Sequence, residues 1–435
     1  MALSTQPYKG ARDFYPEDKR LQKYIFSVMR RVAESYGYEE YDAPILELTE
    51  LFVSKTSDEI VDEQTYTFID RGGRSVTIRP EMTPSVTRMV AAKRQQLVYP
   101  LRWYSIPNFW RYERPQRGRL REFWQLNIDV FGVADIQAEV EVIEVADAIM
   151  QAFGAKRSSY TIKLNSRKLI DKLIKDILGL DQVQASTLIH LIDKLHKMDY
   201  AEFAGQVEGL FNPAQRDKSS PQQLLDFLKL TSLDELPTAL QSVGSVEELK
   251  QLIKLLTDIG VTNIEFDPSL MRGFDYYNDI VFEVFDNHPD NNRSMFGGGR
   301  YDGLIAQFDV EPVPTVGFGM GDVTLANFLE LHELMPVLNV EADIFAILIG
   351  DVYKPAQKVI AELREMGVNV VMGSVSQKTE KQLKTAVKKN IRYALFIGNK
   401  ELDSEQFVLR NLASNSEEKH SLQRVVSIVK DFRKS

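Results

Sequence analysis

Two short stretches of this chain place arginines beside aromatic and acidic residues. The first is Phe-Trp-Arg-Tyr-Glu-Arg-Pro-Gln-Arg-Gly-Arg at 109–119, and the second is Arg-Gly-Phe-Asp-Tyr-Tyr-Asn at 272–278. An arginine side chain stays charged and its planar fork grips two oxygens at once, which suits the binding of phosphates and carboxylates. The alternative for any one of these arginines is a surface ion pair.

The residues that follow the first stretch alternate as in a β-strand. Side chains alternate faces along a strand, so the even-numbered residues of 123–131 form an apolar face that predicts core. The other face carries a ring, two amides and a carboxylate: Phe123, Gln125, Asn127 and Asp129. Such a face is typical of the floor of a ligand site. The alternative is an edge hairpin with a solvated polar side, since strand faces are commonly half polar.

The bulk properties predict a globular protein of two or three domains. The chain has 435 residues and 44% of them are apolar, enough to bury a large core. No apolar run reaches the ~18–20 residues that span a membrane, and the first residues do not resemble a secretory signal. The lack of cysteine excludes disulfides and thiolate zinc sites and fits the cytoplasmic location that we expect. The five histidines are scattered and lack the spacing of a structural metal site.

Charge is distributed unevenly along the chain. The net charge is −9, which argues against broad nonspecific binding of nucleic acid. Residues 341–435 hold 16 Lys/Arg and 12 Asp/Glu, a net of +4 that leaves −13 for the rest. A mildly basic carboxy-terminal part predicts local contact with phosphates. A solvated surface of mixed charge explains so small an excess equally well.

Helical and strand patterns alternate in the first 165 residues. Pro16, followed by apolar residues at helical spacing as far as Tyr36, predicts a capped amphipathic helix. Residues 64–70 and 75–79 alternate around Arg-Gly-Gly, which predicts a β-hairpin. Further along, we expect a helix over 80–96, two long strands over 99–131, a helix over 136–153 and a strand over 160–164.

Composition changes at residue 166. Residues 166–262 are rich in Leu, Lys, Asp and Gln at helical spacing, which predicts an inserted helical module. The sheet is expected to resume with strands near 263–266 and 280–285, before a glycine-rich stretch and a helix over 321–334. Beyond a linker, strand and helix patterns alternate from 342 to 397, which predicts a small α/β domain.

Over nearly its whole length the chain resembles class II aminoacyl-tRNA synthetases, and the histidyl-tRNA synthetase family in particular. Residues 109–131 are similar to the second class II motif, and 272–278 to a histidine signature. The other matches are an amino-terminal signature (10–16), the first class II motif (36–47), an amino-acid-binding turn (79–83) and a second histidine signature (296–304). Ordered matches are specific, whereas the glycine run alone is weak.

The resemblance implies an α+β fold: a class II synthetase-like antiparallel sheet with flanking helices, a helical insertion, and a C-terminal α/β anticodon-binding-like domain. The implied parts are catalytic residues 1–165 and 263–334, the insertion 166–262, a linker 335–341 and the anticodon-binding domain 342–435. The implied activity is ATP-dependent activation of L-histidine to histidyl-adenylate and transfer to the 3′ end of histidine tRNA. A homodimer would pair through the segment around Pro44.

For ATP, the resemblance implies arginines and Mg²⁺ that offset the repulsion between an attacking carboxylate and a phosphate. Arg111 would hold the α-phosphate, and Arg272 would hold both the histidine carboxylate and the α-phosphate, so these two are the expected catalytic residues. Four more residues are implied: Arg119 or Arg121 at the outer phosphates, Phe123 against adenine, and Glu113 by the adenine or the tRNA end.

For histidine, the α-ammonium group has three donors to satisfy. Its implied partners are Glu81, Thr83 and Gln125. Imidazole has two distinct nitrogens, so a site specific for it needs a carboxylate and a hydroxyl, which Asp129 and Tyr277 would supply. Tyr276 is implied as well, although we expect it to be aromatic core because adjacent strand residues face opposite ways. Many family members carry Glu at the position of Asp129, so a bridging water is one expectation.

For tRNA, the loop over 114–118 is similar to one that contacts the acceptor end, where histidine tRNA carries an extra 5′ guanosine. Gln116 and Arg117 are the implied readers. The tail domain would bind the anticodon, and because its few aromatic residues fit core positions, no single anticodon contact is expected from the sequence.

The main departure from the class II pattern lies in its third motif, which ends in an arginine. Here the glycines at 317, 319 and 321 are followed by Asp-Val-Thr-Leu. Either Arg119, Arg121 or Arg300 compensates, or ATP binds weakly, or the protein is not a synthetase. Two alternatives follow: a histidine-sensing regulatory subunit of ATP phosphoribosyltransferase, and a synthetase-like RNA-binding sensor. The intact 272–277 signature and the tail favour the ligase.

Overall fold

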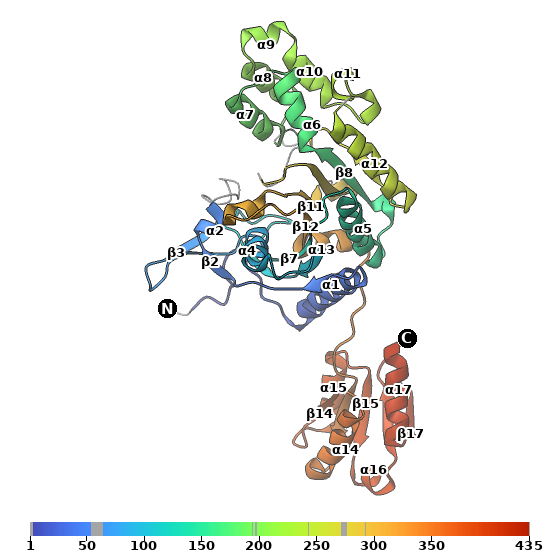
Figure 1. Cartoon of the computed structure of the whole chain (residues 1–435). Helices are drawn as coiled ribbons and strands as arrows, with labels where there is room; N and C mark the ends of the chain where they lie inside the picture. The colour runs from blue at the N-terminus through green and yellow to red at the C-terminus, as the bar shows by residue number, and fades with distance from the viewer. Residues whose placement is uncertain are drawn as a thin grey trace. The chain divides into compact units, whose positions relative to one another are not determined.

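A nine-stranded, mostly antiparallel sheet forms the frame of residues 1–335 (Figure 1). Eight strands lie in the order β1-β5-β7-β12-β11-β10-β8-β9, and β6 pairs with the first residues of β7. The pairs β1·β5 and β8·β9 are parallel. The strands are β1 (Glu39–Glu40), β5 (Leu101–Ser105), β6 (Asn108–Trp110), β7 (Glu122–Phe131), β8 (Tyr160–Ser166), β9 (Ile264–Phe266), β10 (Ile280–Asp286), β11 (Ser294–Arg300) and β12 (Thr315–Gly321). The expected α+β fold is confirmed.

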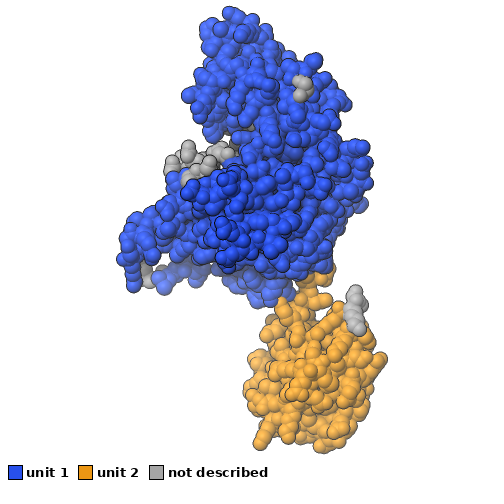
Figure 2. All heavy atoms as spheres, in the orientation of Figure 1, with its two compact units in different colours: residues 1–335 blue, residues 336–435 orange. Residues whose placement is uncertain are grey.

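The computed structural model describes residues 3–53, 64–193, 195, 198–241, 243–270, 276–291 and 293–434. Arg272, expected to be catalytic, lies outside these residues. The chain divides into two compact units, Met1–Met335 and Pro336–Ser435 (Figure 2). Among the helices of the described ranges, none combines the length and the apolar character needed to cross a membrane.

Three helices cover one face of the large sheet. They are α1 (Pro16–Ser35), α5 (Gln137–Ala152) and α13 (Asp322–Leu331). Leu126, Ile128 and Val130 of β7 are buried in this core, as the alternation predicts. The start of α1 is also confirmed, because Pro16 lies in its first turn and the Asp18 carboxylate accepts the N–H of Tyr15 at 3.1 Å.

The opposite face of β7 is buried and polar. Asn127 is 7% exposed and Asp129 is 4% exposed. Buried polar groups are costly unless they have partners, so this face must bind protein or ligand groups. Beside it, α4 (Thr83–Lys93) packs Val86 and Val90 near Leu101. The side chains that surround the polar face therefore come from elements far apart in the sequence.

The region predicted as two long strands contains one long strand, β7, and two short ones, β5 and β6. The interruption falls at Ile106-Pro107, between Ser105 and Asn108. Proline has no N–H to donate to a ladder, which accounts for the break. The prediction failed here because alternation alone does not show where a strand stops.

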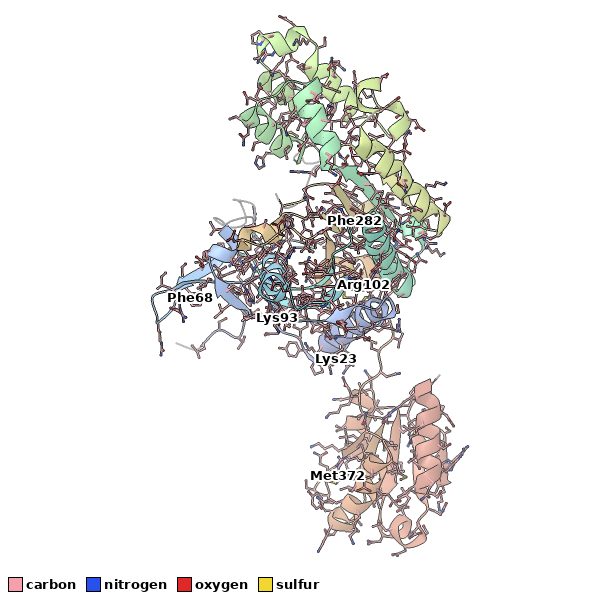
Figure 3. The ribbon with its side chains drawn as sticks, in the orientation of Figure 1. Lys23, Phe68, Lys93, Arg102, Phe282 and Met372 are labelled. Carbon is pink, nitrogen blue, oxygen red and sulfur yellow. The ribbon has the colours of Figure 1, made fainter. Side chains whose placement is uncertain are left out.

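A three-stranded sheet projects from the first part of the chain, in the order β2-β4-β3. The strands are β2 (Leu46–Leu48), β3 (Tyr66–Ile69) and β4 (Ser75–Ile78), and α2 (Glu50–Val53) follows β2. The predicted hairpin of β3 and β4 is confirmed. One face leaves three apolar side chains about half exposed: Leu46, Leu48 and Phe68, the last labelled in Figure 3.

A group of helices lies between β8 and β9 in the chain (Figure 1). They are α6 (Arg167–Lys172), α7 (Gln182–Asp193), α8 (Tyr200–Leu210), α9 (Pro213–Asp217), α10 (Ser220–Phe227), α11 (Thr238–Gln241) and α12 (Gly244–Asp258). The last of them packs against α5 and β8 of the large sheet. Its apolar residues, such as Leu249 and Leu252, join the same core.

The second unit has a five-stranded sheet in the order β14-β13-β15-β16-β17. Its elements are β13 (Ile344–Leu348), α14 (Tyr353–Glu365), β14 (Val370–Met372), α15 (Thr379–Lys388), β15 (Tyr393–Ile397), α16 (Asn399–Ser404), β16 (Phe407–Asn411), β17 (Glu417–His420) and α17 (Leu422–Lys434). The predicted strands and helices as far as residue 397 are present, and the β16–β17 hairpin with its two helices extends them.

Candidate active site

Four glycines of β11 and β12 lie on the same face of the sheet as the polar residues of β7. These two strands therefore contribute no side chains at those positions. The glycines pair as Gly297–Gly319 and Gly299–Gly317. A Cβ atom at Gly317 would lie 2.4 Å from Oδ1 of Asp129, and one at Gly319 would lie 1.6 Å from Nε2 of Gln125. Any larger residue would collide with these side chains, so the glycines form a floor on which the polar groups of β7 rest.

The other two floor glycines lie beneath residues of other segments. A Cβ atom at Gly297 would lie 2.8 Å from Cγ of Glu283, and one at Gly299 would lie 3.0 Å from Cδ1 of Tyr277. Burial, together with the charges of Glu81, Asp129 and Glu283, raises the pKa of Tyr277 above its ordinary value. Tyr277 therefore lies among three carboxylates, an environment that suits a cationic ligand.

Two tyrosine hydroxyls hold the Asp129 carboxylate. Tyr301 donates to Oδ1 and Tyr41 donates to Oδ2, the latter at 3.3 Å. Burial raises the pKa of Asp129 to about 7, while these two hydrogen bonds act in the opposite direction. The carboxyl group therefore titrates near neutral pH. Its two oxygens are fixed in direction by the tyrosines and by the Gly317 floor.

Tyr276 connects the tyrosines to the predicted amino-acid-binding turn. Its hydroxyl donates to Oε2 of Glu81 at 3.0 Å and lies 3.4 Å from Oγ1 of Thr83. The expectation that Tyr276 and Tyr277 face opposite ways is wrong, because neither lies in a strand and their ring centres are 5.0 Å apart. Tyr276 is buried, as core would be, and its hydroxyl still reaches the site.

The predicted ATP residues Arg111 and Phe123 lie together at the β6–β7 hairpin. The Arg111 guanidinium is 5.3 Å from the centre of the Phe123 ring, and its Nε donates to the carbonyl oxygen of Pro80 at 2.9 Å. Phe109, paired with Phe123 in register, is fully buried, and its ring centre lies 5.7 Å from that of Phe123. The hairpin thus holds a cation over an aromatic ring.

Arg121 is firmly held, whereas Arg119 is not. Nε of Arg121 donates to the carbonyl oxygen of Glu113 at 3.1 Å, and its guanidinium lies 4.0 Å from the centre of the Tyr112 ring. The Arg119 side chain is 57% exposed, and its nitrogen is 3.7 Å from the Glu113 carboxylate. Arg119 thus keeps more freedom to meet a ligand.

The predicted tRNA-contacting residues lie at the tip of the loop. Reciprocal backbone hydrogen bonds of 3.0 and 2.9 Å between Gln116 and Arg119 close a tight turn. Gln116 and Arg117 are exposed there. They lie well placed to meet a partner that approaches from solvent.

Comparisons with known proteins give the family. The profile described as "Histidyl-tRNA synthetase" matches residues 10–323, and one described as "Anticodon binding domain" matches residues 343–432. The chain belongs to the histidyl-tRNA synthetase family. The histidine–tRNA ligase of Leptospira biflexa serovar Patoc (strain Patoc 1 / Ames) is 43% identical over 433 residues, which cover 99% of this chain and 98% of that protein. The chloroplastic/mitochondrial histidine–tRNA ligase of Arabidopsis thaliana is 36% identical over 95% of this chain and 85% of its own.

Solved histidyl-tRNA synthetases share the fold. The crystal structure from Nostoc sp. PCC 7120 aligns with a TM-score of 0.83 at 24% identity, over 99% of this chain and all of the other. The apo enzyme of S. aureus aligns with a TM-score of 0.73 at 25% identity, over 98% and 100%. The family consists of aminoacyl-tRNA synthetases, so the expected enzyme class is confirmed.

The third class II motif of this chain lacks its arginine, and the structure shows where Asp322 and Arg300 lie instead. Asp322 is the first residue of α13 and is buried. Arg300, one suggested substitute for the missing arginine, lies on the helix-covered face with its Nε and Nη2 bound to Glu139 at 2.6 and 2.7 Å. Compensation by Arg300 is therefore wrong, because a side chain committed to that ion pair cannot reach the glycine floor.

Sequence reasoning missed three residues of the site. Tyr41 and Tyr301 both lie in segments matched to family signatures, yet nothing in their spacing shows that they converge on one carboxylate. Glu283 left a clearer signal, since it is the one charged residue within the apolar run Ile-Val-Phe-Glu-Val-Phe. A lone acid in an otherwise apolar strand is costly to bury unless a ligand or partner meets it.

Proposed function

We propose that this synthetase binds L-histidine over the glycine floor and activates it with ATP before transfer to the 3′ end of histidine tRNA. The observation that carries the proposal is the fixed, buried Asp129 carboxylate among tyrosines and further carboxylates. Each of its oxygens accepts one tyrosine hydroxyl and keeps a further lone pair that a polarised N–H of the ligand side chain can meet. An amino acid without one would leave buried groups unpaired, at a cost of about 1–3 kcal/mol each.

The proposed contacts to histidine divide between its two polar ends. Asp129 accepts a hydrogen bond from one imidazole nitrogen, and the Tyr277 hydroxyl meets the other. The α-ammonium group lies against Glu81, Thr83 and Gln125. Tyr276 supports this division, because its hydroxyl donates a hydrogen bond to the buried Glu81 carboxylate and so fixes the orientation of that carboxylate.

Activation joins a histidine carboxylate oxygen to the α-phosphorus of ATP and releases pyrophosphate. Negative charge grows on phosphate oxygens in this step, so positioned cations stabilise it. Arg111 is proposed to hold the α-phosphate, Phe123 to stack on adenine, and Arg119 or Arg121 to hold the outer phosphates, with Glu113 at the adenine or the tRNA end. The proximity of Arg111 and Phe123 supports a shared nucleotide.

Mg²⁺ is a further proposed component. Among the described residues, no three His, Asp or Glu side chains gather as a metal site. Mg²⁺ is commonly held by one or two carboxylates plus substrate phosphates, and of the acids near Tyr277, Glu283 is the one without a proposed contact to histidine. The residues present therefore fit an ion delivered with ATP, which would neutralise part of the phosphate charge.

Arg272 is proposed to bridge the histidine carboxylate and the α-phosphate, on the strength of the sequence signature alone. Arg272→Ala should abolish adenylate formation while leaving the fold and the dimer intact, because only the reacting groups lose their bridge. Pyrophosphate exchange and size-exclusion chromatography would check both parts. Normal exchange activity in the variant would remove Arg272 from the mechanism.

The proposed tRNA contacts lie in two places. Gln116 and Arg117, exposed at the loop tip, would meet the acceptor end. The second unit matches an anticodon-binding domain over residues 343–432, which supports a contact with the anticodon. The cytoplasm, where tRNA is charged, is the proposed location.

A homodimer is proposed to form through the three-stranded sheet that follows Pro44. Leu46, Leu48 and Phe68 are 44%, 45% and 46% exposed on one face, and Val76 lies between them in register. A contiguous exposed apolar face is typical of an interface between subunits. Sedimentation of the whole chain tests the proposal, with Phe68→Asp expected to yield monomers.

The experiment that tests the function is histidine-dependent exchange of labelled pyrophosphate into ATP, without tRNA. Exchange specific for histidine would establish adenylate formation.

One observation favours a second candidate, a histidine-sensing regulatory subunit: the third-motif arginine is missing. A protein titled as an ATP phosphoribosyltransferase regulatory subunit/histidyl-tRNA synthetase, from Bacillus halodurans C, shares the fold with a TM-score of 0.73 at 23% identity. Histidine binding without exchange would favour that candidate.

A further inference from the structure

The amino-terminal signature has no part in the site described so far, yet it contacts the loop that carries the arginines. We name residues 8–12 the amino-terminal strap. The carbonyl oxygen of Gly10 accepts the N–H groups of Arg121 and Glu122 at 2.9 and 3.1 Å. The Tyr8 hydroxyl accepts a hydrogen bond from Nη1 of Arg121 at 3.0 Å. The strap thus holds both the backbone and the side chain of Arg121.

The strap also approaches the loop closely. Gly10 has φ of 86°, which L side chains rarely adopt, and a Cβ atom there would lie 2.7 Å from Cγ of Arg121. The aliphatic stem of Arg121 therefore rests directly on the strap backbone. Any shift of the strap would move the arginine with it.

The far end of the strap is fixed by an ion pair. Nη2 of Arg12 lies 2.7 Å from Oδ2 of Asp322, with side chains that are 27% and 6% exposed. The other oxygen of Asp322 accepts the N–H of Trp124 at 2.9 Å. Asp322 begins α13, where the class II pattern carries its arginine, and Trp124 directly follows Phe123. One carboxylate therefore joins the strap, β7 and α13.

This pair differs from an ordinary surface ion pair. Exposed pairs contribute little to stability, because water screens them. Asp322 is almost buried, and burial raises its pKa while Arg12 lowers it. Removal of Arg12 would leave a buried carboxylate without its cation, which is costly, and would release the far end of the strap from α13. The Arg12 guanidinium also lies 4.9 Å from the centre of the Phe14 ring, which keeps it in place.

We propose that Arg12 is a positioning residue for ATP: paired with Asp322, it holds the strap across the base of the loop and so fixes Arg121 and Phe123. The proposal rests on the proposed function. Because the chain has no third-motif arginine, the outer phosphates depend on the loop arginines, and their placement sets the affinity for ATP. Histidine, whose proposed partners lie over the glycine floor, does not depend on the strap.

The test compares the Michaelis constants for ATP and for histidine in pyrophosphate exchange. Arg12→Ala and Asp322→Asn should each raise KM for ATP about tenfold, while KM for histidine stays within about twofold. The double variant should be no worse than either single one, since both remove the same pair. Arg12→Lys keeps the charge and should recover part of the loss.

Arg30→Ala is the matched control. Arg30 lies in the same unit and pairs with Glu40 at 3.0 Å, but both side chains are about 40% exposed. Its KM for ATP should equal that of the wild type. An unchanged KM for ATP in Arg12→Ala, or equal rises of both constants together with a lower Tm, would overturn the proposal.

Titration calorimetry with ATP separates this proposal from the proposed function. If the wild type binds ATP without exchanging pyrophosphate, the ligase function fails, and the strap is judged on binding alone. A dissociation constant for ATP about tenfold higher in Arg12→Ala would support the strap in that case. If Arg12→Ala does not fold, Asp322→Asn and Arg12→Lys provide the same comparison, and wild-type affinity in both would refute it.

Discussion

The two halves of the candidate site are built by opposite means. The histidine side lies over a glycine floor, where Asp129 is buried and both its oxygens have tyrosine partners. The ATP side is formed largely by the 111–121 loop. There the Arg119 side chain is 57% exposed and lies 3.7 Å from the Glu113 carboxylate. The buried polar groups of the histidine side are held in fixed directions, so only a ligand with matching polar groups binds there. An exposed loop can instead change its conformation to meet a ligand. Substitutions should therefore be far more damaging on the floor than at the loop tip.

Among substitutions in the floor and in the loop, the largest effect is expected from Gly317→Ala. Its Cβ atom would meet Asp129 and also the carbonyl oxygen of Ile128 at 2.5 Å, and that backbone atom cannot turn aside. Displacement of Asp129 should lower kcat/KM for histidine more than ~100-fold in pyrophosphate exchange. Gly303→Ala is the matched control, because nothing lies within 4 Å of its Cβ position. Equal losses in both variants would contradict the floor.

A smaller loss, about 10–100-fold in kcat/KM for histidine, is expected from Asp129→Asn. The raised pKa of about 7 also predicts a pH dependence in the wild type. The ionised carboxylate accepts the imidazole N–H, so kcat/KM should fall as pH falls through 7 and the carboxyl becomes protonated. The imidazole of the substrate histidine titrates in the same range and contributes to the pH profile of both proteins. The profile of Asp129→Asn should lack the contribution of the Asp129 carboxyl group. Identical profiles for both proteins would exclude this role.

Tyr301→Phe tests the support of that carboxylate. Loss of one hydroxyl donor should raise KM for histidine about fivefold and move the acidic limb of the pH profile upward, because the hydrogen bond lowers the pKa of Asp129. Tyr41→Phe should have a weaker effect, since its hydrogen bond is long at 3.3 Å. A pH profile that moves downward in Tyr301→Phe would contradict the proposed clamp.

The smallest effect on amino-acid activation is expected from Arg117→Ala. Arg117 is exposed at the loop tip, so pyrophosphate exchange should be unchanged. Aminoacylation should show a KM for tRNA that is about threefold to fivefold higher, with a weaker dependence on salt. A loss of exchange in this variant would mean that the loop tip belongs to the ATP side.

Local patterns allowed most of the fold to be predicted. The alternation in 123–131 predicted the two faces of β7, and Pro16 and Gly72-Gly73 indicated a helix start and a hairpin turn. The edge strand β17 escaped prediction because Glu417–His420 has no apolar residue, so it lacks the period that marks a half-buried strand. Its pairing with β16 decides its conformation instead.

The site was less predictable, because its contacts are long-range. The Tyr41, Tyr301 and Arg12 hydrogen bonds join residues that are 88, 172 and 310 positions apart. Resemblance to a family pointed to several site residues, but only the register of β7, β12 and β11 shows how four glycines come together. The same register shows why Arg300, one residue beyond Gly299, faces away from them.

A crystal structure with bound L-histidine at pH 8 would test the central claim most directly. One imidazole nitrogen should lie ~2.7–3.2 Å from an oxygen of Asp129, with the ammonium group against Glu81 and the ring over the glycine floor. Histidine bound with its imidazole turned away from Asp129, or bound elsewhere in the chain, would contradict the account.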